Sequence, residues 1–171
     1  SIRKFEPTPV PKELIEQLLS AAAMSPSSMN RQPWRFIVIT DRKKIRELSD
    51  AVKRLTPMNG LATHLIERMR STEDLLFYDA PLLILVHADR KLTKWIDIDC
   101  GILSQTMFLA AHSLGLGSCY IGLAQVLNND GKLLRGLGIP DGSEIIAPLI
   151  FGYPAEKKGV PERAPKVVKW I

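Results

Sequence analysis

The sequence has few cysteines and few aromatic residues, and it lacks any long apolar run. Its two cysteines, Cys100 and Cys119, are too few for a disulfide scaffold and too far apart for a C-x-x-C site. No apolar run reaches the ~18 residues that a membrane-spanning helix needs. The start, S-I-R-K-F, has no apolar segment of the signal-peptide kind. We therefore expect buried structural thiols, no membrane partner and a cytoplasmic location.

A basic stripe with interleaved aromatic residues, the usual mark of a nucleic-acid-binding surface, is also missing. The formal net charge is +5, but Lys and Arg are spread along the chain, with local concentrations only at 42–54 and 157–169. Positive charge favours anionic partners in general. A small phosphorylated ligand accounts for the balance as well as DNA does, and we expect no nucleic-acid partner.

The motifs of several common enzyme sites are absent as well. The glycine-rich stretch 115–122 follows a helical pattern and opens a strand, the reverse of the context that dinucleotide-binding glycines require. His64, His87 and His112 have no metal-ligand spacing, and no G-x-S-x-G nucleophile motif occurs. We expect no metal site and no hydrolase, and we expect His87 to be a core residue with satisfied hydrogen bonds.

What is present is the periodicity of a single mixed α/β domain of 171 residues with no internal repeat. Apolar spacing predicts helices over 11–23, from Asp41 to Leu55, around 64–69, over 95–114 and over 125–136, and strands over 35–40, 80–88, 118–123 and 144–151. Both a two-layer and a three-layer arrangement fit this order. The continuous apolar run 80–88 is typical of a central strand covered on both faces.

Two segments carry more apolar residues than their surroundings in the sequence explain. Helix 95–114 is apolar on nearly all sides, which places it in the core or at a subunit interface, and Gly115 ends it. The tail 153–171 is rich in Pro and Lys yet ends in V-V-K-W-I. Such a terminus should dock on another surface, and a second subunit is one candidate.

The densest polar stretch is the loop 25–34, S-P-S-S-M-N-R-Q-P-W, between an apolar helix and an apolar strand. It offers three hydroxyls, two amides, a guanidinium and an indole within ten positions. Loops of this kind on rigid neighbours often carry function. The alternative is an ordinary capped helix end with a Ser/Asn turn, and the loop alone leaves both open.

Four motifs spread over the chain carry a family resemblance. They are S-I-R-K-F at 1–5, P-S-S-M-N-R-Q-P-W-R-F at 26–36, D-C-G running into L-A-A-H-S-L-G-L-G-S-C-Y-I-G at 99–122, and G-Y-P with P-E-R-A-P at 152–154 and 161–165. On these motifs the chain resembles the nitroreductase family of FMN-dependent oxidoreductases over essentially its whole length. Tyr120 stands where the family motif has Trp.

The resemblance implies an α+β (mixed α/β) nitroreductase-like fold in one FMN-binding domain, residues 1–171, with a central mixed, mostly antiparallel sheet flanked by helices. It implies a homodimer with FMN at the interface and a C-terminal tail exchanged across the dimer. The implied enzyme takes hydride from NADH or NADPH and reduces nitroaromatic, quinone or similar flat acceptors by a ping-pong mechanism. Reductive dehalogenation, flavin breakdown, ferredoxin-linked reduction and non-catalytic FMN binding are the alternatives.

The resemblance also implies roles for individual residues. Ser1 and Arg163 would bind the FMN phosphate, and Arg3 would lie by the N1–C2=O edge of the flavin ring. Pro26, Ser27, Ser28 and Asn30 would reach the flavin of the other subunit, with Gln32 supporting their loop. Tyr120, Ile121, Gly122 and Leu123 would pass beside the ring and offer a backbone N–H to N5. No side chain is expected to be catalytic, because the flavin N5 carries the chemistry. Asn59 and Arg68 are candidates for further flavin contacts in the region 56–70, where the family's substrate lid commonly lies.

Overall fold

The computed structural model describes residues 1–59, 63, 66–67, 74, 76–159 and 161–171. Four strands form one sheet in the order β1-β2-β4-β3, and their bounds are β1 Arg35–Ile39, β2 Leu82–Asp89, β4 Ser143–Gly152 and β3 Gly117–Tyr120. Each neighbouring pair of these strands is antiparallel. The expected sheet flanked by helices is confirmed, and the described strands form no parallel pair.

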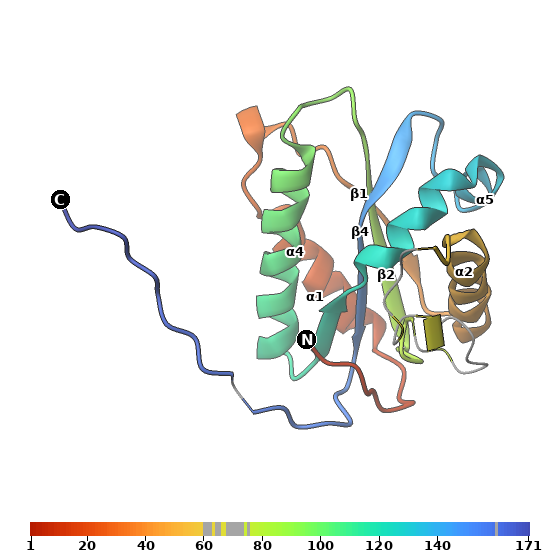
Figure 1. Cartoon of the computed structure of the whole chain (residues 1–171), viewed down its shortest axis with the longest axis horizontal. Coiled ribbons are helices and arrows are strands. Elements are labelled where there is room, and N and C mark those ends of the chain that lie inside the picture. Colours follow the sequence, from red (N-terminus) through yellow and green to blue (C-terminus); the bar gives the residue numbers. More distant parts are fainter. Residues whose placement is uncertain (60–62, 64–65, 68–73, 75, 160) are drawn as a thin grey trace.

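Helices cover both faces of this sheet, so the chain adopts the three-layer arrangement (Figure 1). On one face pack α1, Lys12–Ala23, and α4, Ile96–Ser113. On the other lie α2, Arg42–Leu55, the 3₁₀ helix η2, Gly122–Asn129, and α5, Gly131–Gly136. Alternate residues of β2 enter the two cores, with Ile84 on the α4 side and Leu85 on the α2 side. The central, doubly covered strand expected at 80–88 is confirmed.

Local chemistry explains where the first two helices begin. α2 starts after Asp41, whose carboxylate accepts the backbone N–H of Lys43 at 2.8 Å, as an N-cap side chain does. α1 starts after Pro11, a place where the missing N–H of proline removes no helical hydrogen bond. Both helices lie where the apolar spacing predicts them.

The region after β3 differs from the prediction. The strand expected over 118–123 ends at Tyr120, and the helix expected over 125–136 is divided into η2 and α5. Asn128 exchanges two hydrogen bonds with the backbone of Ile145, at 2.9 and 2.8 Å. Asp130 then caps α5 by accepting the N–H of Leu133 at 2.9 Å. Short polar side chains that bind backbone groups compete with a continuous helix in this way.

The first six residues, the N-terminal arm (residues 1–6), pack against β3 and the end of β4. Backbone hydrogen bonds of 2.9 to 3.0 Å run from Ile2 to Ser118, from Glu6 to Tyr153 and from Ala155 to Lys4. Gly117 permits the close approach, because a Cβ at this position would lie 2.8 Å from the Ile2 side chain. The arm is therefore fixed by backbone pairing and by the absence of a side chain beneath it.

The C-terminal residues 161–171 leave the body of the molecule as an extended tail (Figure 1). Their apolar end stays exposed, with Trp170 at 87%. The terminus therefore does not dock on its own chain, and docking on a second subunit stays a prediction. Burying Val168, Trp170 and Ile171, which are each 87% or more exposed, needs an apolar surface beyond the described part of the chain.

Two further expectations concern burial. Among the described residues, no helix combines the length and the apolar character needed to cross a membrane. Cys100 and Cys119 are free thiols and both are buried, as predicted. Burial raises the pKa of Cys100 to about 12, so this thiol stays protonated and unreactive at neutral pH.

Candidate functional site

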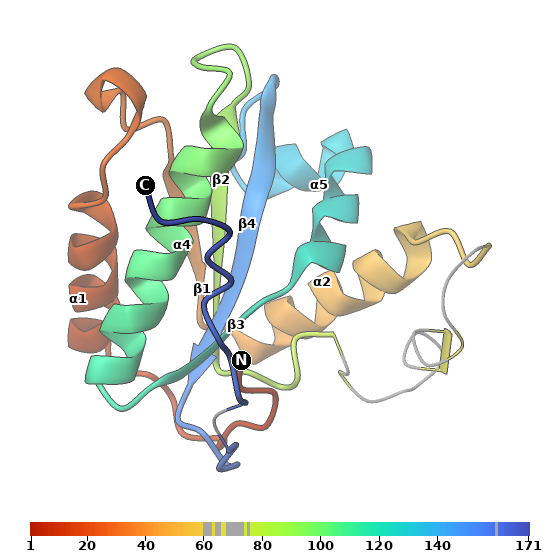
Figure 2. The same cartoon turned by 60° about the vertical axis from the view of Figure 1, so that its left-hand side comes forward.

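The residues assigned to a cofactor lie in three separate places within one chain. The N-terminal arm and the β3–η2 junction lie near the C-terminal end of α4, and loop 25–34 lies near its N-terminal end (Figures 1 and 2). Arg163 lies on the extended tail. Asn59 follows α2 in a turn, and Arg68 lies outside the described residues. Within one chain, Ser1, Arg3 and residues 120–123 thus lie at a first end of the molecule, near the C-terminal end of α4. The loop lies at a second end, near the N-terminal end of α4.

The first end contains a pocket of about 170 Å³, the arm pocket, lined by Arg3, Leu76, Tyr78 and residues 119–123. The Arg3 guanidinium lies 6.0 Å from the centre of the Tyr78 ring, at the outer limit of a cation–π contact. The backbone N–H of Arg3 donates to the Glu156 carboxylate at 2.6 Å, and this bond lowers the pKa of Glu156. The arm therefore brings a cation to a pocket whose other side is formed by residues 119–123.

That other side is the junction of β3 and η2. Ile121 N–H donates to Pro148 O at 2.9 Å, and Ala124 N–H donates to Ile121 O at 2.9 Å. The N–H groups of Gly122 and Leu123 open η2, where backbone donors have no intrahelical acceptor. Because both residues line the arm pocket, their N–H groups are the candidate donors to an acceptor atom bound there.

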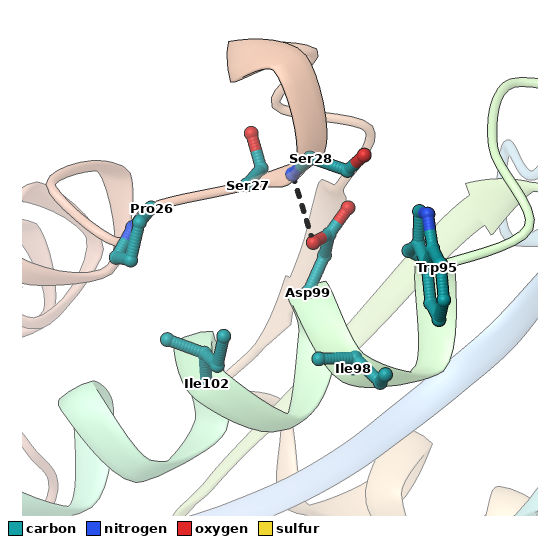
Figure 3. Close-up of a pocket in the computed structure, with 7 residues that line it drawn as sticks. All are labelled: Pro26, Ser27, Ser28, Trp95, Ile98, Asp99 and Ile102. Atoms are coloured by element: carbon teal, nitrogen blue, oxygen red, sulfur yellow. Dashed lines mark hydrogen bonds between the residues drawn. The ribbon is translucent and has the colours of Figure 1, made fainter.

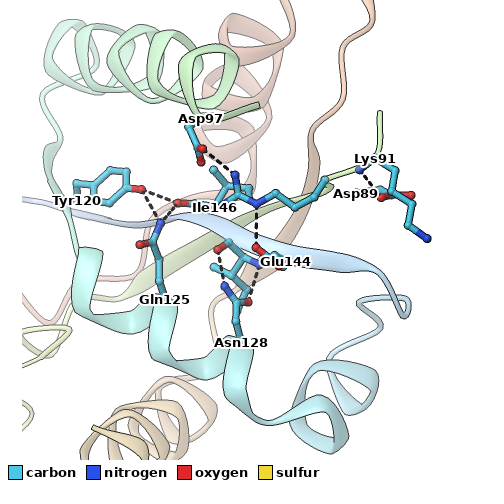
Figure 4. A network of polar contacts seen from close by, with 10 residues as sticks. Asp89, Lys91, Asp97, Tyr120, Gln125, Asn128, Glu144 and Ile146 are labelled. Atoms are coloured by element: carbon cyan, nitrogen blue, oxygen red, sulfur yellow. Dashed lines mark hydrogen bonds and ion pairs between the residues drawn. The ribbon is translucent and has the colours of Figure 1, made fainter. Parts of the chain in front are cut away.

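Side-chain hydrogen bonds hold this junction on β4 (Figure 4). The Tyr120 hydroxyl donates to Ile146 O at 2.5 Å, and the Gln125 amide donates to the same oxygen at 2.6 Å. Burial raises the pKa of Tyr120, which keeps its hydroxyl a donor. This hydroxyl is used within the fold, so Tyr120 has only its ring and its backbone left for a ligand.

Figure 4 also shows an ion-pair bridge between α4 and β4. Arg90 donates to Asp97 at 2.7 Å and to Glu144 at 2.8 Å. The bonds to these two carboxylates raise the pKa of Arg90. The bridge joins the start of α4 to the start of β4, but its three side chains are exposed to water, so it contributes little to the stability of this part of the fold.

The second end contains the loop pocket, a cavity of about 320 Å³ lined by Pro26, Ser27, Ser28, Trp95, Ile98, Asp99 and Ile102 (Figure 3). Ser28 N–H donates to Asp99 Oδ1 at 3.0 Å, and this bond joins the loop to α4. Asp99 is the first residue of the D-C-G motif, but the resemblance assigned it no role of its own.

The loop itself adopts an unusual backbone conformation. Met29, Asn30 and Gln32 have positive φ angles of 53°, 53° and 46°, a region that costs non-glycine residues about 1 kcal/mol or more each. Ser27 Oγ accepts the Gln32 N–H, and Asn30 Oδ1 accepts from the Gln32 amide, both at 2.9 Å. After the backbone-capped end of α1, the loop forms a 3₁₀ turn over Ser28–Asn30 that these bonds brace, so both interpretations of the loop stay open.

Three buried side-chain atoms of the described residues have no hydrogen-bond partner: Ser25 Oγ, Asp99 Oδ2 and His87 Nδ1. Such atoms are uncommon in folded proteins. His87 is 5% exposed, so its placement in the core is confirmed, but the expectation of satisfied hydrogen bonds is wrong for Nδ1. Burial and then the charge of Arg35 lower the pKa of His87, which leaves the ring neutral at pH 7.

The outward side of α4 carries an apolar stripe, which consists of Trp95, Ile98, Ile102 and Leu109. Their spacing places them on one side of the helix. Ile98 is 56% and Leu109 63% exposed, while Leu103 and Met107 on the opposite side are buried in the core. The predicted burial of this helix is therefore complete on one side only, and an exposed apolar stripe is typical of an interaction surface.

Sequence reasoning missed Tyr78 in the arm pocket. Its φ angle is 57°, and that of Asp79 is 50°, so the turn before β2 reverses in the left-handed region and carries the ring towards Arg3. The Asp-Ala-Pro that follows Tyr78 signals a turn, but no local pattern says which distant residue the turn meets. Among the described residues, no group of three His, Cys, Asp or Glu side chains is placed to hold a metal ion.

Comparison with known proteins gives one consistent result. The sequence model of the nitroreductase family matches residues 1–153. A protein of Methanothermobacter thermautotrophicus, provisionally named an NADH dehydrogenase/NAD(P)H nitroreductase, is 34% identical over 163 residues, which cover 93% of this chain and 75% of that protein. A nitroreductase with bound FMN from Bacteroides fragilis has a TM-score of 0.85 and 29% identity, covering 100% of this chain and 92% of that one. Another, from Desulfitobacterium hafniense, also with bound FMN, has a TM-score of 0.86 and 28% identity, covering 100% and 93%.

Proposed function

The chain belongs to the nitroreductase family, and from that premise we propose that it is a single-domain, FMN-dependent oxidoreductase that works as a homodimer. The observation that supports this most is the arm pocket, which joins the Arg3 guanidinium to the backbone donors of Gly122 and Leu123. These groups come from distant parts of the sequence. Together they suit the polar edge of a flavin ring.

The arm pocket fits a flavin in charge and in hydrogen bonding. A reduced flavin carries negative charge at N1, which a fixed guanidinium stabilises where water is partly excluded. The N–H of Gly122 or Leu123 would donate to N5. The pocket of about 170 Å³ is smaller than the ~300 Å³ of typical ligand sites, so a second surface has to complete it.

In this proposal the second surface is the loop of another copy of the chain. Pro26, Ser27, Ser28 and Asn30 of one subunit would contact the flavin held in the arm pocket of the other, with Gln32 bracing the loop. The apolar stripe would pack between the subunits, and the tail would cross to the partner. Ser1 and Arg163 would bind the FMN phosphate. The arm pocket and the loop pocket share no lining residue within one chain, which supports this arrangement.

The proposed reaction takes hydride from NADH or NADPH and reduces a nitroaromatic, a quinone or a similar flat acceptor in ping-pong order. Bound FMN would supply the hydride-transfer chemistry. The chain's own part is to hold the ring, to place a cation at its N1 edge and to place a donor at N5. No side chain is required as an acid or base.

An anaerobic titration tests the proposal. We expect the purified protein, supplied with FMN, to show a bound-flavin spectrum that NADH or NADPH bleaches and that nitroaromatic or quinone acceptors restore. A protein that binds no FMN would overturn the proposal. A bound flavin that neither nucleotide bleaches would favour a non-catalytic FMN-binding protein, and restoration only by halogenated aromatic compounds would favour reductive dehalogenation.

A further inference from the structure

We propose that Asp99 is a positioning residue for loop 25–34, and that it acts on the flavin held by the partner subunit. This role rests on the proposed function, and no cofactor contact has been assigned to Asp99. Its carboxylate accepts, at 3.0 Å, the backbone N–H of Ser28, which is the first residue of the 3₁₀ turn Ser28–Asn30. Through that bond the rigid helix α4 fixes the place where the loop begins to turn.

The loop needs such a fixed point because its conformation is not the relaxed one. Met29, Asn30 and Gln32 all lie in the left-handed region, and the hydrogen bonds of Gln32 to Ser27 and Asn30 join loop residues only to one another. Internal bonds preserve the shape of a loop but not its position relative to a ligand. A polar surface that contacts a cofactor must be held to within about 0.5 Å, which requires a contact with a rigid element.

Among the described residues, two long-range side-chain hydrogen bonds join the polar part of the loop to other elements, while Trp34 at its end packs in the core. Arg31 donates to Leu92 O at 2.5 Å, but this contact is exposed to water. Asp99 is 3% exposed, so its bond to Ser28 is protected from competing water and is assisted by the charge of the carboxylate. Of these two hydrogen bonds, the one to Asp99 is therefore the stronger, and it acts at the 3₁₀ turn itself.

The second oxygen of Asp99 supports a functional reason for this acid. Oδ2 is buried and has no hydrogen-bond partner, and the side chain lies beside Ile98 and Ile102 (Figure 3). Burying a carboxylate with one of its oxygens unpaired costs free energy. A residue chosen only for packing would be apolar here. A residue that is present although it lowers the stability of the fold is typical of a functional site.

A double-mutant cycle on FMN affinity tests the bond between Asp99 and Ser28. Asp99→Ala removes the acceptor, and Ser28→Pro removes the N–H donor without touching α4. Proline is tolerated at the first helical position, and Ser27, with φ −140° and ψ 158°, has the extended conformation required before proline. Ser28→Ala removes the hydroxyl alone and is the reference for Ser28→Pro.

We expect Asp99→Ala to raise the dissociation constant for FMN about tenfold, and Ser28→Pro to raise it about tenfold above Ser28→Ala. The double variant should be no more than about twofold weaker than the weaker single variant, because both changes remove the same bond. Asp99→Asn keeps an acceptor oxygen and should stay within about twofold of wild type. Additive single effects, or an Asp99→Asn variant as weak as Asp99→Ala, would overturn the proposal.

A mixed dimer tests action across the interface and separates positioning from a general loss of stability. A dimer of one Asp99→Ala chain and one Arg3→Ala chain places both changes in one site and leaves the other site unaltered, since the two sites are related by symmetry. We expect about half of the sites to bind FMN with wild-type affinity. Two impaired sites would contradict the cross-subunit role. Asp97→Asn, an exposed acid in the same first turn of α4, serves as the matched control and should leave FMN affinity unchanged. Wild-type protein that binds no FMN would instead refute the proposed function itself.

Discussion

The two ends of α4 are built in different ways. At the arm pocket, backbone hydrogen bonds pair the N-terminal arm with β3 and the start of the tail, and the groups that face the pocket are fixed within one chain. At the loop pocket, side-chain bonds brace a strained turn, and an apolar stripe beside it faces solvent. The arm end resembles a finished half of a site, whereas the loop end has the features of a surface that another molecule completes.

The largest expected effect comes from preventing the loop end of one subunit from packing on a second subunit. Ile98→Glu places a charge in the exposed apolar stripe, so we expect a monomer whose FMN affinity falls about a hundredfold. The unfolding free energy of a separated subunit should change by no more than about 0.5 kcal/mol, because the side chain is exposed within one chain. Light scattering coupled to size exclusion, flavin titration and urea denaturation measure the three quantities.

Lys132→Gln on α5 is the control for this change, since it alters the net charge by the same amount on the opposite side of the sheet. It should remain dimeric and bind FMN normally. If Ile98→Glu dimerises and binds FMN as the wild type does, the loop end is not a surface that a second subunit has to complete.

The arm end should respond through its backbone packing. In Gly117→Ala the new Cβ would lie 2.8 to 3.0 Å from three atoms of the Ile2 side chain, so the arm has to shift. We expect a loss of about 1–3 kcal/mol in unfolding free energy and about tenfold weaker FMN binding, because Arg3 moves with the arm. Chemical denaturation and flavin titration check both.

Gly136→Ala provides the matched comparison, because a Cβ there meets nothing within 4 Å. This change in α5 should stabilise the protein by about 0.5–1 kcal/mol. Equal behaviour of the two alanine variants would show that close packing of the arm is unimportant.

A smaller effect is expected from the hydrogen bonds that hold the β3–η2 junction. Tyr120→Phe removes one of the two donors to Ile146 O and leaves the Gln125 amide in place, so the cost should be about 1 kcal/mol. Gln125→Ala should cost a similar amount. Urea denaturation of both single variants and the double variant measures these costs. The double variant should lose more than the sum, since it leaves a carbonyl unpaired. Strict additivity would mean that water replaces the missing donors.

The smallest effect concerns His87, near the start of β1. Its pKa is lowered in the folded protein, so below the unfolded value of about 6.5 the unfolded chain binds the proton more readily. Stability from the neutral ring is thus complete above about pH 6.5 and declines as the pH falls towards the folded pKa. We expect His87→Gln to reduce the loss of melting temperature between about pH 7.5 and about pH 5.5. His112→Gln, an exposed position on α4, should retain the wild-type slope. An unchanged slope in His87→Gln would exclude this contribution.

Much of the fold could be predicted from the sequence because its signals are local. The apolar run of β2 and the Asp41 cap of α2 depend on neighbouring residues, and both occur as expected. The break between η2 and α5 was missed, although Asn128 and Asp130 stand at it. Their effect depends on a partner strand, since Asn128 bonds to Ile145 on β4.

The candidate site could be predicted only as far as its motifs reach. Arg3 and residues 120–123 do share one pocket, but Tyr78 and Asp99 carried no motif-based role. Tyr78 reaches the pocket through a left-handed turn, and Asp99 acts through a distant backbone N–H. The tail was expected to dock, and its apolar end remains exposed in a single chain. The sequence pattern shows that this end is apolar, but it does not show which surface the end contacts.

The pairing of the N-terminal arm has a consequence for biosynthesis. The arm is synthesised well before its hydrogen-bond partners, Ser118, Tyr153 and Ala155. Closing so long a loop has to await those residues. Arg3 therefore takes its place over Tyr78 only after Ala155 has been synthesised, and until then the arm lacks these hydrogen-bond partners. The arm pocket can thus form only after the C-terminal half of the chain has been synthesised.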